Sequence, residues 1–164
     1  MELKTRLSPV LSTYNSPLGA IIIIADTCAV KAVFFQDLGI TQPAISVGFT
    51  EPIRTLTAEL DKYFAGKLRE FTTPYDIQGT PFQVRVWESL CTISYGTTLS
   101  YREQAVIVQK PMGYRAVAAA NGANKLAIIV PCHRVINSNG ALGGYRGGLM
   151  RKRWLLEHEK RYGI

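Results

Sequence analysis

The sequence predicts an α+β protein in which a small N-terminal β-rich domain, an antiparallel sheet plus a helix, precedes a mainly helical domain with a helix-turn-helix. Three observations predict this order. Short segments rich in Val, Ile, Tyr and Phe come first, segments with helical periodicity and capping residues follow, and the charge balance changes between them. Residues 1–79 carry seven Lys/Arg and eight Asp/Glu, a balance of −1, whereas residues 80–164 carry twelve and four, a balance of +8. We therefore expect a structural domain over 1–79 and a functional domain over 80–164.

The first domain begins with three short apolar segments that are typical of strands. They span residues 10–14, 20–25 and 29–35. The sequence Asn-Ser-Pro-Leu-Gly separates the first two segments and favours a turn, and a tight link separates the second from the third. These features predict an antiparallel meander whose Ile-rich middle strand is buried.

A helix is expected over residues 51–65, since apolar residues recur there on one side and Gly66 is a plausible stop. Residues 36–50 have the mixed composition of a loop. Residues 67–79 predict a linker or a final strand.

Helices are predicted for most of the second domain. A capping Thr80 followed by proline starts one helix, and Ser100 with Glu103 forms a capping box that starts another, ending near Gln109. Further helices are expected over 113–121 and 149–162. In the last helix we expect Leu149, Trp154, Leu155 and His158 to face inward, and the cationic residues Arg151, Lys152, Arg153, Lys160 and Arg161 to face mostly outward. An apolar strand over 126–130 is expected to lead to Cys132.

Two short helices joined by a tight turn inside a basic region indicate a helix-turn-helix and a polyanionic partner. An ordinary αα-hairpin with a basic, soluble surface explains the same pattern. The charge asymmetry between the two halves is what favours the nucleic-acid interpretation.

The cysteines indicate a reducing compartment. Cys28, Cys91 and Cys132 are widely spaced and form no CxxC or CxxH pair, so neither a zinc site nor a disulfide framework is expected. The N-terminus lacks a secretory signal, and the longest strongly apolar run, residues 20–25, is too short to cross a bilayer. We expect a cytoplasmic protein without metal or membrane attachment.

Cys132 is the candidate nucleophile, because His133 follows it directly. The thiolate is the reactive form of cysteine, and a neighbouring imidazole can take its proton. A carboxylate that orients the imidazole would complete the arrangement, and Glu157 and Glu159 are the nearest later candidates. A buried, inert cysteine is the commoner fate of an isolated residue of this kind.

The residues around Cys132 resemble the signature of the O6-alkylguanine-DNA alkyltransferases. That signature is matched by Pro131-Cys132-His133-Arg134-Val135. Further matches occur in the same order along the chain: Thr80-Pro81-Phe82-Gln83, Val86-Trp87, Tyr95-Gly96, Ser100-Tyr101, Arg115-Ala116-Val117, Asn121, Asn124, Gly143-Gly144-Tyr145, Gly147-Gly148-Leu149, Lys152, Trp154-Leu155-Leu156 and His158-Glu159. The resemblance is dense over residues 80–160 and loose over 1–79.

The resemblance implies a role for each matching residue. Cys132 corresponds to the alkyl acceptor, His133 to a base acting through a bound water, and Glu159 to the carboxylate that polarises this relay. Asn124 corresponds to a brace between the helix-turn-helix and the active-site loop, and Tyr101 to the residue that crowds the target phosphate and helps protonate the leaving guanine. The implied DNA- and substrate-binding residues are Arg115, Tyr101, Arg102, Ala116, Val135, Ser138, Tyr145 and Arg146.

The reaction implied is a direct, irreversible transfer of a methyl or small alkyl group from O6 of guanine, with O4 of thymine as an extension, to Cys132. O6 lies inside the duplex, so the nucleotide must be flipped out, at a cost of about a few kcal/mol. Arg115 would fill the vacated stack, and minor-groove binding suits a protein that scans for lesions. No cofactor is implied. The partner is double-stranded DNA containing O6-alkylguanine, and we expect a monomer without an obligate protein partner.

The sequence departs from the family pattern at three positions. Lys125 stands where proline usually follows Asn124, Ser94 stands where proline is common, and Arg146 occupies a pocket-edge position that is often small. Arg146 could narrow the tolerance for bulky alkyl groups. Without the resemblance, Tyr101, Arg115, Glu159 and Asn124 have ordinary explanations as a helix-start aromatic, a solvated cation, a surface carboxylate and a turn residue.

Three other functions are compatible with parts of the pattern. The first is a non-enzymatic lesion-binding protein, although such relatives lack the acceptor cysteine. The second is a helix-turn-helix regulator that performs no chemistry, and the third is a cysteine hydrolase. A covalent change of the protein by alkylated DNA separates the alkyltransferase from all three.

Overall fold

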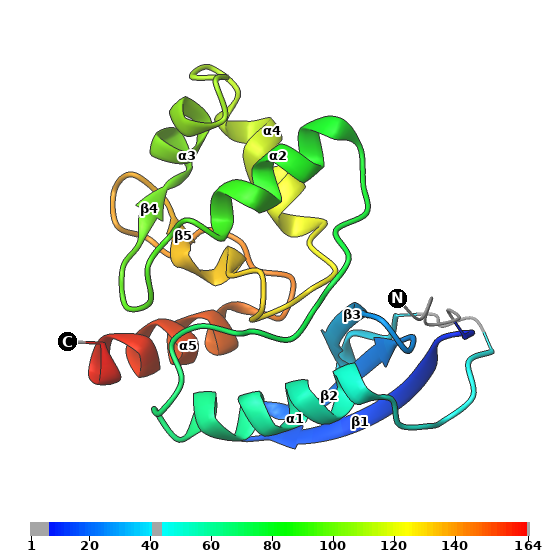
Figure 1. Ribbon diagram of the computed structural model, residues 1–164. Helices are drawn as coiled ribbons and strands as arrows, with labels where there is room; N and C mark the ends of the chain where they lie inside the picture. The colour runs from blue at the N-terminus through cyan, green and yellow to red at the C-terminus, as the bar shows by residue number, and fades with distance from the viewer. Residues whose placement is uncertain (1–6, 41–43, 164) are drawn as a thin grey trace. The chain divides into compact units, whose positions relative to one another are not determined.

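The computed structural model describes residues 7–40 and 44–163. The chain divides into two compact units, Met1–Asp76 and Ile77–Ile164 (Figure 1). The first unit holds an antiparallel sheet with helix α1, and the second is mainly helical. This arrangement confirms the predicted α+β class.

The sheet of the first unit is the predicted meander. Its strands lie in chain order as β1 (Val10–Ser16), β2 (Gly19–Ala25) and β3 (Val30–Phe35). Ser16 pairs with Gly19, which leaves two residues for the turn between β1 and β2. The five residues from Ile21 to the end of β2 are buried, because both faces of this central strand are covered.

Helix α1 (Glu51–Phe64) follows a short 3₁₀ turn, Gln36–Leu38. Its inward face is fully buried, as the apolar spacing predicts, and consists of Ile53, Leu56, Leu60 and Tyr63. The chain leaves the helix through Gly66, whose φ of +73° is the left-handed conformation that glycine tolerates best.

The segment after α1 is tied back to the helix by Glu59. This buried carboxylate accepts hydrogen bonds from the backbone N–H and hydroxyl of both Thr72 and Thr73; the Thr72 N–H lies 2.9 Å and the Thr73 hydroxyl 2.9 Å from its oxygens. Tyr75 forms an isolated parallel bridge with Val30. The predicted linker is thus an ordered connection with a single strand-like contact.

The second unit is built mainly from helices, and the first two of them begin at the predicted caps. The helices are α2 (Pro81–Leu90), α3 (Tyr101–Ile107), α4 (Tyr114–Gly122) and α5 (Leu149–Tyr162). The predicted box at Ser100 and Glu103 is present, and Thr80 forms a second box with Gln83. Helices α3 and α4 pack together and both contact α2.

The stretch over residues 126–130 is not the strand that its apolar sequence predicts. Its backbone turns on itself, with Val130 N–H donating to Leu126 O at 3.0 Å and Ile128 at a φ of +71°. A short apolar run can be buried either as a strand or as a compact turn, and its periodicity does not distinguish these two structures. The strand pairing here is a parallel contact between β4 (Leu99–Ser100) and β5 (Val135–Ile136).

Helix α5 has the predicted bounds, but two of its side chains point the wrong way. Leu149 is 51% exposed, and Lys152 is fully buried. The ammonium of Lys152 donates to the carbonyls of Val135 at 2.6 Å and Gly144 at 3.0 Å, which compensates for its burial. Helical periodicity alone would place a lysine outside, so this contact was not predictable from spacing.

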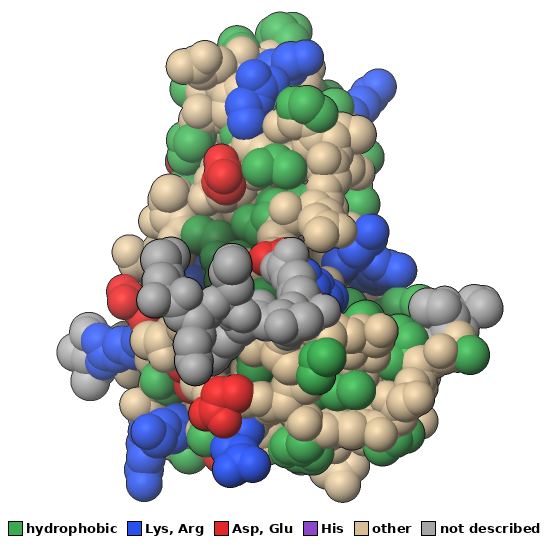
Figure 2. Space-filling view, turned by 45° about the vertical axis from the view of Figure 1, so that its right-hand side comes forward, with side chains coloured by type: hydrophobic (Ala, Val, Ile, Leu, Met, Phe, Trp, Pro, Cys, Tyr) green, Lys and Arg blue, Asp and Glu red, His purple; other side chains and the backbone are tan. Residues whose placement is uncertain are grey.

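No helix within residues 7–40 and 44–163 is both long and apolar enough to cross a membrane. Figure 2 shows Lys and Arg side chains beside apolar ones at the end of the second unit that carries α3 and α4. Val106, Ile107 and Met112 are exposed there.

Candidate active site

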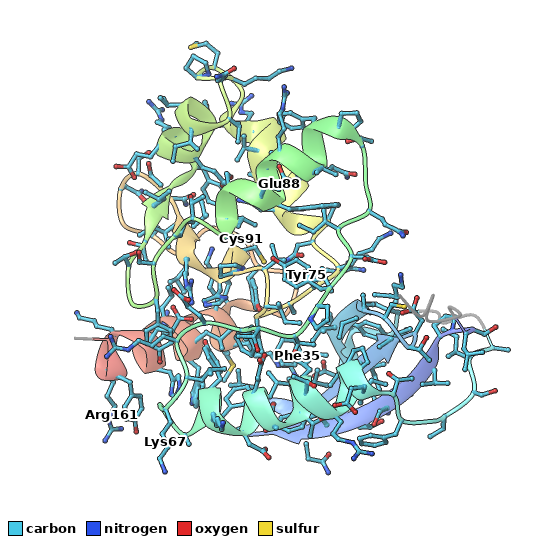
Figure 3. All side chains as sticks on the ribbon, in the orientation of Figure 1. Phe35, Lys67, Tyr75, Glu88, Cys91 and Arg161 are labelled. Carbon is cyan, nitrogen blue, oxygen red and sulfur yellow. The ribbon has the colours of Figure 1, made fainter. Side chains whose placement is uncertain are left out.

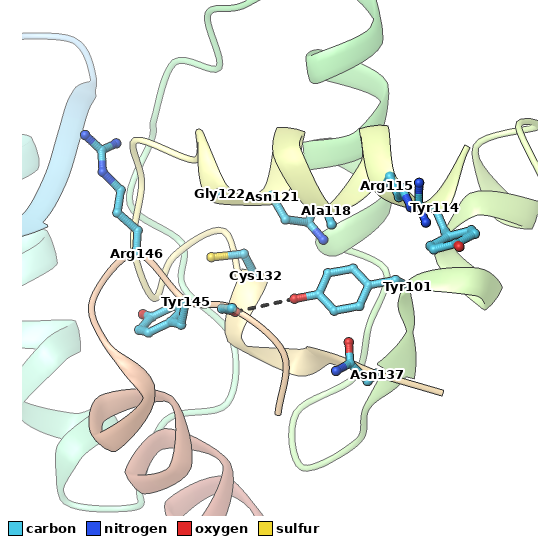
Figure 4. A pocket seen from close by; sticks show the side chains of 11 residues that line it. Tyr101, Tyr114, Arg115, Ala118, Asn121, Gly122, Cys132, Asn137, Tyr145 and Arg146 are labelled. Atoms are coloured by element: carbon cyan, nitrogen blue, oxygen red, sulfur yellow. Dashed lines mark hydrogen bonds between the residues drawn. The ribbon is translucent and has the colours of Figure 1, made fainter. Parts of the chain in front are cut away.

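Cys132 lies at a cavity of about 300 Å³ within the second unit (Figure 4). It is the first residue of a 3₁₀ turn, Cys132–Arg134, and is 8% exposed. Side chains from α3, α4 and the loop before α5 surround it. The cavity is lined by Tyr101, Tyr114, Arg115, Ala118, Asn121, Gly122, Cys132, Asn137, Gly144, Tyr145 and Arg146.

Asn124 holds the thiol of Cys132 in place. Its amide nitrogen lies 2.8 Å from Val130 O and 3.3 Å from Cys132 Sγ, and its amide oxygen accepts from Leu126 N–H at 3.0 Å. One side chain thus connects the end of α4 to the turn that carries the cysteine. Lys125, which stands where the family pattern usually has proline, is exposed.

His133 forms a buried cluster with Arg134 and Glu159. His133 Nε2 lies 2.7 Å from Glu159 Oε1, while Arg134 Nε and one terminal nitrogen donate to the same carboxylate at 2.8 and 3.0 Å. Arg134 also donates to Ile93 O at 2.7 Å. The hydrogen bonds of His133 and Arg134 and the charge of Arg134 hold the pKa of Glu159 far below its usual range, although burial opposes this.

The protonation state of His133 follows from this cluster. Burial lowers the pKa of the imidazole below its ordinary 6.5, despite the opposing charge and hydrogen bond of Glu159. A neutral imidazole beside an ionised carboxylate places its proton on Nε2, facing Glu159. Nδ1 is then the basic nitrogen, and it is buried without a hydrogen-bond partner among the described residues.

The thiol of Cys132 needs such a base. Burial raises the pKa of Cys132 above its ordinary 9.0, and the hydrogen bond from Asn124 with the charges of Lys152 and Arg146 offsets this only in part. At neutral pH the resting thiol is therefore protonated, and a group that removes its proton would produce the nucleophile.

Two tyrosines stand beside the sulfur. Tyr101 donates from its hydroxyl to Gly144 O at 3.4 Å, and the Tyr145 hydroxyl is buried with no partner among the described residues. Burial raises the pKa of both phenols, so each is a neutral donor at physiological pH. Lys152 Nζ lies 3.5 Å from the Tyr101 hydroxyl, and burial lowers its pKa to about 8.

The helical pair presents cations next to the cavity. Arg115 is exposed on α4 and lines the cavity, and Arg102 is exposed on α3. Their guanidinium carbons lie 5.8 and 5.2 Å from the ring centre of Tyr114. Ala116 is exposed beside Arg115, and its short side chain leaves the helix backbone accessible at this point.

Two predicted pocket residues lie elsewhere. Val135 is fully buried in the β4–β5 pair, and Ser138 is exposed in the turn that follows. Neither is among the residues that line the cavity, where Asn137 stands instead. The parallel β4–β5 pairing turns Val135 into the core. A strand of two residues is too short to show an alternating pattern in the sequence, so this orientation was not predictable. The other two cysteines also lie outside the cavity; Cys91 is exposed just after α2 (Figure 3).

Sequence reasoning assigned no role to several residues that build the site. Arg134 appeared only as part of a matching motif, and Lys152 only as a motif residue expected to face outward, yet they hold Glu159 and the loop before α5. Gln104 and Asn121 exchange reciprocal amide hydrogen bonds of 3.1 and 2.7 Å that join α3 to α4. Lys152 interrupts the inward face of its helix, and a charged residue in that position is the signal that could have found it.

Together, the fold and the site define a class of protein. It is an α+β protein with a basic helical domain, and a buried cysteine of that domain lies at a cavity beside a pair of helices. A histidine that is bound to a carboxylate follows the cysteine directly.

Two family models match the chain. The ribonuclease-like domain of 6-O-methylguanine DNA methyltransferase matches residues 10–77, and the DNA binding domain of the same family matches residues 81–161.

Relatives show the same similarity over different lengths. A methylated-DNA–protein-cysteine methyltransferase from Methanosarcina barkeri is 42% identical over 148 residues, which cover 89% of this chain and 94% of that protein. A protein of the same name from Mycobacterium tuberculosis is 57% identical over 102 residues, so the matched segment spans 62% of the length of each protein.

Solved structures agree in fold. The M. tuberculosis O6-methylguanine methyltransferase superposes with a TM-score of 0.88 at 39% identity, covering 96% of both chains. The M. tuberculosis OGT in complex with DNA superposes with a TM-score of 0.85 at 42% identity over 92% of both chains. The chain belongs to the 6-O-methylguanine DNA methyltransferase family.

Proposed function

We propose that this protein repairs DNA by taking a methyl or small alkyl group from O6 of guanine and keeping it on Cys132. One observation carries the proposal: the Cys132 thiol lies at a cavity, and the next residue is a buried imidazole whose Nε2 is fixed by Glu159 and whose Nδ1 has no partner among the described residues. A nucleophile, a base and an orienting carboxylate are thus present together.

The transfer is a displacement at the alkyl carbon. His133 Nδ1 accepts the thiol proton through a bound water, and the thiolate attacks the carbon attached to O6. The S–C bond forms as the C–O6 bond breaks, and the electron pair of that bond goes to the guanine. Tyr101, a neutral phenol at the cavity wall, donates a hydrogen bond to the leaving base and helps its protonation.

The product is a thioether, which no group in this site is arranged to hydrolyse. Regeneration would require breaking a C–S bond with a nucleophile that attacks the same carbon, and Cys132 is itself buried. Each molecule therefore reacts once.

The helical pair brings the lesion to the sulfur. We assign α4 to the minor groove, with Arg115 entering the base stack where the target nucleotide was and Ala116 permitting close approach. Arg102 contacts the backbone. A base that pairs badly, as an alkylated guanine does, costs less to extrude, which directs the protein to lesions. O4-methylthymine carries the same reactive alkyl ether and is the natural second substrate to test.

Intact mass spectrometry after mixing with an O6-methylguanine duplex tests the proposal. One added methyl per molecule is expected, and none in Cys132→Ala, while Cys91→Ala reacts like the wild type. Tight DNA binding without a mass gain would instead indicate a lesion-binding or regulatory protein. Multiple turnover on an ester would indicate a hydrolase.

A further inference from the structure

Arg146 is a cation at the cavity that forms no ion pair with any described carboxylate. It lies in the glycine-rich loop before α5, is exposed, and lines the same cavity as Cys132. Figure 4 shows it on one side of Cys132, with Arg115 on the other side. The charge network that holds Glu159 uses Arg134 instead.

The cavity as a whole favours an anion. Its lining includes two arginines, Arg115 and Arg146, and no aspartate or glutamate. The buried ammonium of Lys152 adds a third positive charge behind Gly144. Among the charges and hydrogen bonds that favour the thiolate of Cys132, the charge of Arg146 contributes least. An anionic group that enters next to the sulfur would therefore meet Arg146 without displacing an existing partner.

The chemistry of the side chain specifies the kind of ligand. A guanidinium presents a planar set of donors that matches the paired oxygens of a phosphate or a carboxylate. A nucleotide placed in this cavity brings a backbone phosphate on each side of its sugar, and these phosphates must pass the rim. Contacts to phosphate fix the register of a bound strand.

We propose that Arg146 binds an anionic group of the substrate at the rim of the cavity, opposite Arg115. This inference rests on the proposed function. The anion has two sources: the backbone phosphate beside the extruded nucleotide, or a carboxylate carried by the alkyl group itself. In either case Arg146 is a positioning residue, which holds the alkyl carbon against Cys132 from the side that Arg115 does not reach.

The first experiment measures single-turnover methyl transfer from an O6-methylguanine duplex by Arg146→Gln. The matched control is Arg153→Gln, an exposed arginine of α5 that does not line the cavity. Wild-type transfer itself tests the proposed function, so the two ideas fail separately. If a backbone phosphate is the anion, the rate at subsaturating DNA should fall about tenfold for Arg146→Gln and less than twofold for the control.

Neutral methylphosphonate linkages, placed one at a time beside the lesion, locate the anion. If the phosphate is the partner, one linkage slows the wild type about tenfold and does not slow Arg146→Gln further, because both changes remove the same contact. If the alkyl carboxylate is the partner, the loss in Arg146→Gln is confined to an O6-carboxymethyl lesion and is absent with its neutral carbamoylmethyl isostere.

The remaining alternative is that Arg146 acts only on the sulfur. Alkylation of Cys132 by iodoacetamide, followed by peptide mass spectrometry, reports the reactivity of the thiol without any DNA. We expect the rates of wild type and Arg146→Gln to agree within about twofold. A loss with iodoacetamide equal to the loss with DNA would overturn the proposal. So would a loss no greater than that of Arg153→Gln with both the O6-methylguanine and the O6-carboxymethylguanine duplex.

Discussion

Glu59 in the first unit and Glu159 in the second are buried carboxylates that several hydrogen-bond donors hold, and they differ in what lies beyond those donors. Glu59 accepts from the hydroxyls and backbone of Thr72 and Thr73, and the contact closes a connection onto α1. Glu159 accepts from His133 and Arg134, and the imidazole of His133 carries a second nitrogen without a partner among the described residues.

The difference shows how to separate a structural cluster from a functional one. Burial and hydrogen-bond count are similar, since Glu59 is 7% and Glu159 is 1% exposed. In the Glu59 cluster, the N–H and hydroxyl groups of Thr72 and Thr73 all bind the carboxylate and hold this connection against α1. In the Glu159 cluster, one member keeps an unused basic atom next in sequence to a nucleophile. A buried polar atom left without a partner costs free energy, and its retention points to a role.

The largest effect should come from removing that basic atom. In His133→Gln the thiol keeps its raised pKa but loses the imidazole, and we expect the rate of methyl transfer to fall by about 10²–10⁴-fold. Single-turnover kinetics at saturating duplex would measure it. DNA affinity and circular dichroism are the controls, and a rate within threefold of the wild type would show that His133 is not the base.

Substituting Glu159 and Glu59 in turn tests most directly whether the two clusters differ in function. Glu159→Gln removes the charge that orients His133, so we expect transfer to slow by about 10–10²-fold. Glu59→Gln should lower the free energy of unfolding by about 1.5–3 kcal/mol, through weaker hydrogen bonds, and leave the rate unchanged. Urea titrations and single-turnover rates on both variants test this. Equal losses of rate would contradict the distinction.

The smallest effect concerns Lys152, which is buried against carbonyl oxygens and has a pKa lowered from 10.5 to about 8. Between these values the unfolded chain binds more protons than the folded protein, so stability should rise with pH, by up to about 1.4 kcal/mol per pH unit. Urea midpoints from pH 8 to 10 should carry this contribution in the wild type, against the opposite trend from the raised pKa of the Cys132 thiol, and lose it in Lys152→Met. Lys160→Met, an exposed lysine of the same helix, should keep it; identical slopes in all three proteins would refute the expectation.

Much of the fold was predictable because local signals agree with it. The Ile-rich β2, the spacing of Leu56 and Leu60 in α1, and the box of Ser100 and Glu103 each specify an element from a few neighbouring residues. The stretch over 126–130 was mispredicted, since its turn depends on contacts within a buried core rather than on local pattern.

Cys132, His133 and Glu159 were predictable from their chemistry and from the resemblance, whereas the residues that hold them in place were not. The prediction that Glu159 is the partner of His133 agrees with the geometry, and the geometry leaves aside the other candidate, Glu157, which is exposed. Val135 and Lys152 lie in the core because of contacts between segments far apart in the chain: the parallel β4–β5 pairing for Val135, and the carbonyls of Val135 and Gly144 for Lys152. Such contacts leave no periodic trace in a single sequence.

The central claim is that the sulfur of Cys132 attacks the alkyl carbon and leaves the guanine oxygen in the DNA. A duplex with a trideuteromethyl group on a guanine O6 that is itself oxygen-18 labelled tests both halves together by tandem mass spectrometry. We predict one trideuteromethyl group on Cys132 and full retention of oxygen-18 in the repaired guanine. Loss of oxygen-18 from the DNA, or the labelled methyl on any other residue or in solvent, would contradict the mechanism.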